Sequence, residues 1–239
     1  MPIKGKRIAD EGIYLDGEYI EKPKEIFVFQ GDLIDSLDNP SSQKILDVGC
    51  ASGEFVHYLK HRFPNCQADG VDVSEALVKK AREYVPGSNF IVGSALDASI
   101  FLDKKYDVVN CCSVLSIFED IEQPLRNFLS CVGDGGAVII NTIINEDPID
   151  VVMNYRRSDS EGEWESGWNI FSKITVEKAL HRIDPNLIWS WHPFEISFPL
   201  DKRDDTMRTW TMQTEHNPHQ LINGACQLVN MQALRIVVR

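Results

Sequence analysis

The chain has 239 residues, of which 43% are hydrophobic, enough to bury a substantial core as one α/β domain. Its formal net charge of −12 repels nucleic-acid phosphates and anionic lipids, so we expect neither nucleic acid nor membrane as a partner. No apolar segment has the length of a membrane span or the form of a signal sequence, which predicts a cytoplasmic protein. The six cysteines have no C-x-x-C spacing, so we expect neither a disulfide framework nor a metal site.

Apolar strands alternate with amphipathic helices through the first part of the chain. In chain order the sequence predicts a strand at 44–49, a helix at 54–63, a strand at 68–73, a helix at 74–85 with Ser74 as its N-cap, strands at 89–93 and 106–114, a helix at 124–132, a turn at 133–136 and a strand at 137–143. This alternation predicts an α/β fold with a doubly wound, mostly parallel sheet. Ligands of such sheets collect at the carboxyl ends of the strands.

The pattern changes after residue 144. A polar stretch with two tryptophans is followed by a predicted helix at 174–183 and by β-rich sequence. Two predicted strands, 206–214 and 220–229, form a C-terminal β-hairpin insertion before a last strand at 233–239. We therefore divide the chain into a cap or lid segment (1–42) and a main domain (43–239), which comprises a cofactor core (43–144), a substrate-side segment (145–170) and a C-terminal β region (187–239).

The loop after the first predicted strand carries the strongest signal for a ligand. It reads Gly49-Cys50-Ala51-Ser52-Gly53, and it lacks the middle glycine of a dinucleotide-binding loop. Asp47 precedes it, and a carboxylate there repels pyrophosphate and favours a positively charged ligand. S-adenosylmethionine fits, because it bears a sulfonium and an ammonium and no phosphate. Asp72 ends the next strand, where a carboxylate can accept both ribose hydroxyl hydrogen bonds.

The segment 43–144 resembles the class I S-adenosylmethionine-dependent methyltransferases. Five stretches carry the resemblance, in the family's order and spacing: "LDVGCASGEF", "GVDVS", "FIVGSALD", "YDVVNCCSVLSIFED" and "DGGAVII". The resemblance implies a Rossmann-like sheet of seven strands and S-adenosyl-L-methionine as cofactor, with S-adenosyl-L-homocysteine as product. The residues that it implies for cofactor binding are Asp47, Gly49, Cys50, Ala51, Gly53, Asp72, Val73, Ser94, Ala95, Leu96, Cys111 and Cys112. The family often carries an acid where Ser94 stands. In this chain Asp97 or a backbone carbonyl would have to accept the hydrogen bond from adenine N6.

Two nucleic-acid chemistries lack their signatures. A cysteine nucleophile for pyrimidine methylation would follow a proline. No proline precedes Cys111 or Cys112, so both are interpreted as structural. Asn110 is followed by these cysteines and not by the Pro-Pro-aromatic sequence of exocyclic amine methylation. No Asp-Asp-Asn arrangement supports a catechol-type metal site.

In-line methyl transfer to a hydroxyl is helped by a general base. The candidates are His192, whose aromatic neighbours indicate a partly buried imidazole, and Glu146, which follows the fifth strand. The alternatives are a structural histidine and a solvated loop carboxylate.

Residues outside the core are expected to select the acceptor. The candidates are aromatic or basic residues of the cap and of the long segment after the fifth strand: Tyr14, Tyr155, Arg156, Arg157, Trp164 and Trp168. The C-terminal hairpin is expected either to cap the site, to form a homodimer contact, or merely to extend the sheet.

These features favour methyl transfer to a small polar acceptor, by preference a hydroxyl of a sugar or secondary metabolite. Two alternatives stay open: N-methylation of a small amine, and a binding module that holds S-adenosylmethionine without turnover. A nicotinamide-dependent reductase is disfavoured by the glycine pattern.

Overall fold

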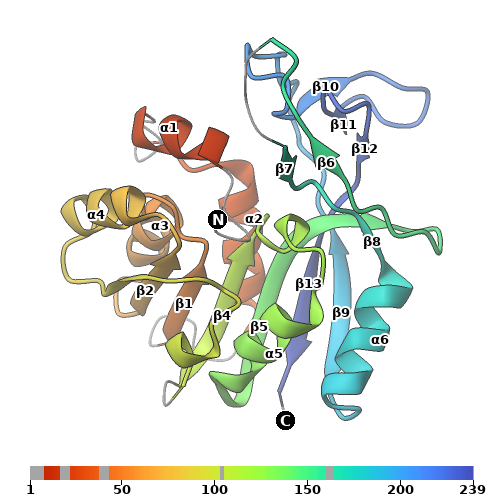
Figure 1. Ribbon diagram of the computed structural model, residues 1–239. Helices are drawn as coiled ribbons and strands as arrows, with labels where there is room; N and C mark the ends of the chain where they lie inside the picture. The colour runs from red at the N-terminus through yellow and green to blue at the C-terminus, as the bar shows by residue number, and fades with distance from the viewer. Residues whose placement is uncertain (1–7, 17–21, 38–42, 103–104, 160–163, 239) are drawn as a thin grey trace.

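A computed structural model describes residues 8–16, 22–37, 43–102, 105–159 and 164–238. Its central sheet has seven strands in the order β3-β2-β1-β4-β5-β13-β9, and a short eighth strand pairs with the end of β5 (Figure 1). The bounds are β1 Lys44–Val48, β2 Gln67–Asp72, β3 Phe90–Val92, β4 Tyr106–Cys112, β5 Val132–Asn145, β8 Phe171–Ser172, β9 Ile188–Pro193 and β13 Met231–Val237. β13 runs antiparallel to both β5 and β9, and the five strands from β3 to β5 are parallel. The predicted doubly wound, mostly parallel sheet is confirmed.

Helices cover both faces of the sheet. Their bounds are α1 Ile8–Asp16, α2 Glu25–Asp35, α3 Glu54–Arg62, α4 Glu75–Tyr84, α5 Glu122–Ser130 and α6 Lys173–Ile183, with single 3-10 turns η2 Ala98–Ile100 and η3 Leu115–Ile117. Apolar residues of α2, α3 and α4 pack in one buried cluster, and those of α5 and α6 pack in another. The sheet lies between the two clusters. α2 therefore belongs to the core, although it lies in the segment expected as a cap.

Local signals account for where several helices begin. The Ser74 hydroxyl accepts a hydrogen bond from the N–H of Leu77 at 3.3 Å, so the predicted N-cap of α4 is confirmed. Ser172 caps α6 in the same way, through the N–H of Thr175. In each case a side-chain oxygen satisfies one of the N–H groups that the first helical turn leaves without a partner.

One predicted turn is absent from the structure, and the predicted C-terminal hairpin has an additional strand. The Gly-Asp-Gly-Gly sequence at 133–136 is not a turn before β5 but an irregular part of it, with the register against β4 shifting between Tyr106 and Val108. The predicted C-terminal hairpin is present as β10 (Trp210–Met212) and β11 (Gln220–Ile222), and β12 (Leu228–Val229) adds a third strand. The second predicted strand is interrupted by a turn between Ile222 and Leu228, in which Cys226 has a positive φ of 60°. A strand cannot continue through this left-handed conformation.

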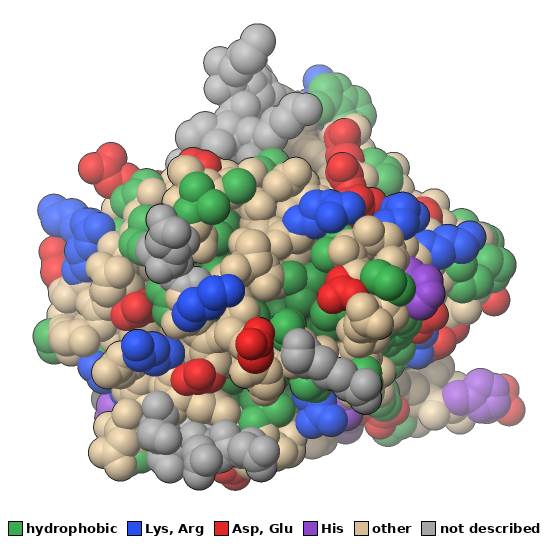
Figure 2. Space-filling model, turned by 90° about the horizontal axis from the view of Figure 1, so that it is seen from below, with side chains coloured by type: hydrophobic (Ala, Val, Ile, Leu, Met, Phe, Trp, Pro, Cys, Tyr) green, Lys and Arg blue, Asp and Glu red, His purple; other side chains and the backbone are tan. Residues whose placement is uncertain are grey.

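The additions to the core gather at the carboxyl-end side of the sheet. α1, the short pair β6 (Asn154–Tyr155) and β7 (Glu165–Ser166), and the β10–β12 sheet all lie there (Figure 1). The opposite side, on which β13 ends, shows basic and acidic side chains interspersed with apolar ones (Figure 2). Among the described residues, no helix combines the length and the apolar character that a bilayer crossing requires. Any site at the carboxyl ends is thus enclosed by segments from both ends of the chain.

Candidate functional site

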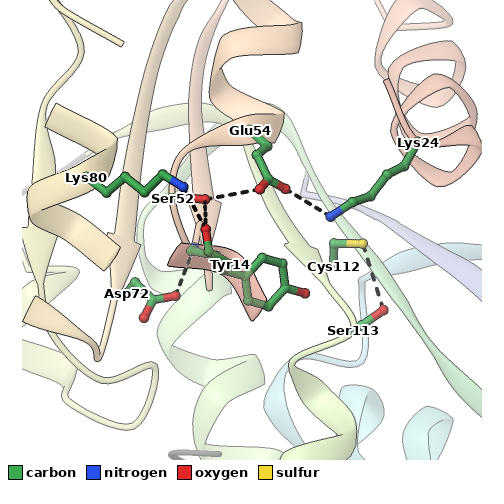
Figure 3. A network of polar contacts seen from close by, with 9 residues as sticks. Tyr14, Lys24, Ser52, Glu54, Asp72, Lys80, Cys112 and Ser113 are labelled. Carbon is green, nitrogen blue, oxygen red and sulfur yellow. Dashed lines mark hydrogen bonds and ion pairs between the residues drawn. The ribbon is translucent and has the colours of Figure 1, made fainter. Parts of the chain in front are cut away.

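The glycine loop between β1 and α3 is held in shape by a carboxylate from the neighbouring strand. Gly49, Ala51 and Gly53 have positive φ values of 78°, 47° and 83°. Asp72, at the end of β2, accepts hydrogen bonds from the N–H of Ala51 and from the N–H of Ser74, both at 2.9 Å (Figure 3). The loop, with its strained Ala51, is therefore fixed before any ligand binds.

Three carboxyl groups surround this loop. Asp47 and Glu54 are buried and Asp72 is half-buried. The Glu54 carboxylate forms an ion pair with Lys24 Nζ at 2.9 Å. Burial raises the pKa of Asp47 to about 7; the hydrogen bond from Asn110 opposes this rise, and the charges of Asp72 and Glu54 add to it. A helix N-terminus usually attracts anions, but here three carboxyl groups lie beside it, and Lys24 neutralises one of them, Glu54. The arrangement repels a pyrophosphate and suits a cationic ligand.

Asp47 stands at the end of a buried chain of polar side chains. The Nδ2 of Asn110 donates to Asp47 Oδ1 at 2.7 Å, and the Nε2 of Gln30, on α2, donates to Asn110 Oδ1 at 2.9 Å. Both amide residues are fully buried. The chain orients the Asp47 carboxyl from beneath the loop.

Asp47 should make stability fall with rising pH. Its pKa is raised from 3.8 to about 7 on folding, so the folded protein binds more protons than the unfolded chain between these values. The stabilising contribution is present below about pH 4 and is lost as pH rises through 7. Denaturant unfolding of Asp47→Asn should show a weaker decline over this window than the wild type. Equal pH dependence of the two proteins would contradict the assignment.

The residues expected around the adenine lie together after β2 and β3. Val73, Ser94 and Leu96 are half-buried, and Ala95 is buried, with its carbonyl accepting from Asn127 Nδ2 at 2.8 Å. The Asp97 carboxylate, one of the two suggested partners for adenine N6, caps η2 through the N–H and hydroxyl of Ser99. Their roles toward a ligand stay predictions.

The cysteines near the loop are poor nucleophiles. Cys50 and Cys111 are buried, and burial raises the pKa of each thiol well above its ordinary value. Cys112 is half-buried at the end of β4; burial and the charge of Asp47 raise its pKa to about 12. A thiol that stays protonated at neutral pH does not attack, which agrees with the structural interpretation of Cys111 and Cys112.

The C-terminus of α1 is fastened to the glycine loop. The backbone carbonyl of Tyr14 accepts from Ser52 Oγ at 3.3 Å and from Lys80 Nζ at 3.0 Å. The Tyr14 ring lies 5.1 Å from Lys24 Nζ and 5.4 Å from Arg208 Cζ, which comes from the C-terminal β region. Tyr14 therefore lies beside the glycine loop, where the sequence analysis expected it (Figure 3). The three cations were not foreseen, because they are far apart in sequence and belong to no motif.

The other proposed substrate residues do not converge on the loop. Arg157 pairs with Asp159 at 2.9 Å, and Arg156 covers the ring of Trp164, which is 66% exposed. The hydroxyl of Tyr155 donates to Glu165. Trp168 packs in a separate apolar cluster with residues of β5 and β11. These contacts favour a structural role for most of the segment.

Neither proposed base reaches the glycine loop. Across the sheet, Cys112 pairs with Asn141, Asn141 with Ala233, and Ala233 with His192. His192 is therefore three strand spacings, about 14 Å, from Cys112. Its Nε2 hydrogen-bonds Ser190 Oγ, and burial and Arg235 lower its pKa. Glu146 forms an ion pair with Lys173 at 2.8 Å, which holds its pKa below the ordinary value and makes it a weak base. The geometry disfavours both assignments.

The strand order, the glycine loop and the acid that ends β2 together define the Rossmann-like class of S-adenosylmethionine-binding domains. Residues 46–138 match the family model described as a methyltransferase domain. Over this part of the chain the sequence is similar to S-adenosylmethionine-dependent methyltransferases.

Two curated relatives illustrate the similarity in sequence. A malonyl-[acyl-carrier protein] O-methyltransferase of Ilyobacter polytropus is 31% identical over 105 residues, 43% of this chain and 38% of the relative. A trans-aconitate 2-methyltransferase of Variovorax paradoxus is 28% identical over 134 residues, 56% of this chain and 51% of the relative. The matches thus span about half or less of the relatives' length.

Two solved structures agree with the fold over nearly the whole chain. Streptomyces venezuelae DesVI has a TM-score of 0.58 at 15% identity, and the match covers 98% of each chain. The S-adenosylmethionine-bound CalS10, an amino pentose methyltransferase from Micromonospora echinaspora, has a TM-score of 0.59 at 12% identity, with the same coverage. At these identities the likeness concerns the fold alone.

Proposed function

We propose that the protein transfers the methyl group of S-adenosyl-L-methionine to a hydroxyl group of a small polar acceptor and releases S-adenosyl-L-homocysteine. The observation that carries this proposal is the set of carboxyl groups of Asp47, Glu54 and Asp72 around a preformed glycine loop. Negative charge at this position favours a sulfonium cofactor over a nicotinamide dinucleotide.

The residues present fit the cofactor. Each oxygen of a carboxylate can accept more than one hydrogen bond, so Asp72 can hold the ribose hydroxyls while it keeps the N–H groups of Ala51 and Ser74. Asp47, with its carboxyl ionised, would face the positive methionyl end. When bound, the cofactor supplies an activated methyl group and a neutral thioether as leaving group.

The protein's own contribution to this reaction is positioning and exclusion of water. Tyr14 and the end of α1 cover the glycine loop, tied to it through Ser52 and Lys80. The turn after β4 also contacts this loop, because Val114 packs against Gly49. Enclosure between these elements holds the reacting atoms in line and strengthens the electrostatic interactions there.

One relative's name gives a small acceptor, trans-aconitate, and the other's gives a malonyl group on a carrier protein. We propose an acceptor space beside Tyr14 (Figure 3) and the turn after β4, where Val114 packs against Gly49. We propose that this space admits a hydroxylated metabolite.

Binding and turnover can be tested separately. Calorimetry should show binding of S-adenosyl-L-homocysteine and no binding of NAD⁺. Methyl transfer from labelled S-adenosyl-L-methionine should then be measured with hydroxylated, amino and carboxylic compounds, including methyl glucoside, glucosamine and glucuronate, with mass spectrometry to locate the methyl group. Transfer to oxygen of a hydroxyl supports the proposal, and transfer to nitrogen replaces it by N-methylation. Cofactor binding without any transfer would indicate a binding module.

A further inference from the structure

α2 is connected to the candidate site through a buried amide. The Gln30 side chain, in the middle of α2, is fully buried, and its Nε2 donates to Asn110 Oδ1 on β4 at 2.9 Å. Asn110 in turn donates to Asp47 Oδ1 at 2.7 Å. Lys24, the residue before α2, forms the ion pair with Glu54. α2 and the residue that precedes it therefore each act on a carboxyl group beside the glycine loop.

The direction of this amide chain is tied to the charge of Asp47. An ionised carboxylate only accepts hydrogen bonds, so Asn110 presents its Nδ2 to Asp47 and its Oδ1 to α2, where Gln30 Nε2 provides the donor. The orientation of both amides thus follows from the carboxylate. Gln30 Oε1 stays buried, with no hydrogen-bond partner in the described part of the chain.

A protonated Asp47 favours the opposite direction. Its O–H would donate to Asn110 Oδ1, Asn110 Nδ2 would donate to Gln30 Oε1, and both amides would have to turn over. An N–H group of Gln30 would then take the buried position in which Oε1 has no partner among the described residues. Buried N–H groups without a partner are rarer in proteins than such carbonyl groups. Gln30 therefore stabilises the direction that goes with an ionised Asp47.

The other titratable groups around Asp47 do not favour its ionisation. Burial raises the pKa of Asp47 to about 7, and the hydrogen bond from Asn110 opposes this rise. The charges of Asp72 on β2 and Glu54 on α3 raise the pKa further, although Lys24 neutralises Glu54. Burial also raises the pKa of the neighbouring thiols, which stay neutral: Cys50, Cys111 and Cys112. The amide of Asn110 is thus the described hydrogen-bond donor that favours the charged form.

We propose that Gln30 is a positioning residue for cofactor binding: through Asn110 it holds Asp47 in the ionised form that the positive methionyl end of S-adenosyl-L-methionine requires. The inference rests on the proposed function, because it takes Asp47 to face that end of the cofactor. It gives α2, which lies in the segment expected as a cap, a role in the pH dependence of binding. Cofactor affinity rises with pH as Asp47 ionises, and Gln30 moves this rise to lower pH.

Gln30→Met keeps the length of the side chain and removes its donor. Calorimetry with S-adenosyl-L-homocysteine gives the ratio of variant to wild-type affinity at each pH, in which the titration of the ligand itself cancels. The midpoint of the affinity rise should move up by about 0.5–1 pH unit, as expected for one lost hydrogen bond. The variant should bind about three to ten times more weakly below the midpoint and within about twofold of wild type well above it. A packing defect alone would weaken binding equally at every pH.

Gln232→Met is the matched control. Gln232, on β13, is also buried, and its Nε2 donates to Glu146. The control loses one hydrogen bond of a buried glutamine at a position outside the amide chain, so it should keep the wild-type midpoint.

NMR of the wild type provides a second readout, which holds even if Gln30→Met does not fold. The side-chain amide signals of Asn110 and Gln30 should move with pH at one shared midpoint, because both amides respond to the same carboxyl group. Gln30 signals that stay fixed while those of Asn110 titrate would overturn the role of Gln30. A Gln30→Met variant with the wild-type midpoint would overturn it as well, and in both cases the proposed function stands.

Asp47→Asn tests the proposed function separately. This variant should lose the wild-type pH dependence of cofactor affinity. If it keeps both the affinity and the pH dependence of wild type, Asp47 does not face the cofactor, and the inference about Gln30 fails for that reason. If the wild type does not bind S-adenosyl-L-homocysteine at any pH, the proposed function fails and this inference fails with it.

Discussion

Asp72→Ala should weaken binding of S-adenosyl-L-homocysteine by about 2–3 kcal/mol, because charge-assisted hydrogen bonds to the ribose are lost. The structure adds a second reason. The same carboxylate holds the N–H groups of Ala51 and Ser74, so the glycine loop loses its support from β2. Calorimetry measures the affinity, and thermal unfolding measures the cost to the free protein.

Asp69→Asn is the matched control for this measurement. Asp69 lies on the same strand, near its amino end, where it accepts from the N–H of Asn89 and from the hydroxyl of Tyr106. It should leave the affinity for S-adenosyl-L-homocysteine unchanged. If Asp72→Ala bound as tightly as wild type, Asp72 would be a structural clamp only, and the ribose would need another partner.

Gly49→Ala should destabilise the fold by about 2–4 kcal/mol, even without a ligand. Gly49 has a φ of 78°, and a Cβ at this position would overlap Cγ2 of Val114 in the turn after β4. The left-handed conformation accounts for about 1 kcal/mol and the overlap for the rest. A side chain at position 49 would therefore contact Val114 in the folded protein even when no ligand is bound, so its effect is not limited to blocking the ligand.

Gly87→Ala separates the two contributions. Gly87 has a similar φ of 85°, and its nearest neighbour would be the mobile end of Lys60 at 3.6 Å, so it should cost only about 1 kcal/mol. The double variant Gly49→Ala/Val114→Ala should recover most of the difference. Urea denaturation of the four proteins gives these values, and equal destabilisation by Gly49→Ala and Gly87→Ala would show that Val114 moves aside at no cost.

The core elements and the glycine loop could be predicted from sequence because their determinants are local. Apolar periodicity marks β1, α3, β2 and α4, and Ser74 caps α4 within three residues of the N–H that it serves. Asp72 could likewise be placed near the loop, because parallel neighbouring strands end at the same edge of the sheet. These features depend on contacts along the chain or between adjacent strands.

Positions that depend on register and on distant segments were decided by the tertiary structure alone. His192 is half-buried as its neighbours suggested, but it lies on an edge strand, and only the pairing of β9 with β13 shows how far it is from β4. Trp168 is taken up by an apolar cluster formed with the C-terminal β region. The cations around Tyr14 come from residues 24 and 208, and the buried amides that orient Asp47 come from residues 30 and 110. Such contacts leave no periodic trace in a single sequence, because each joins residues that only the folded chain brings together.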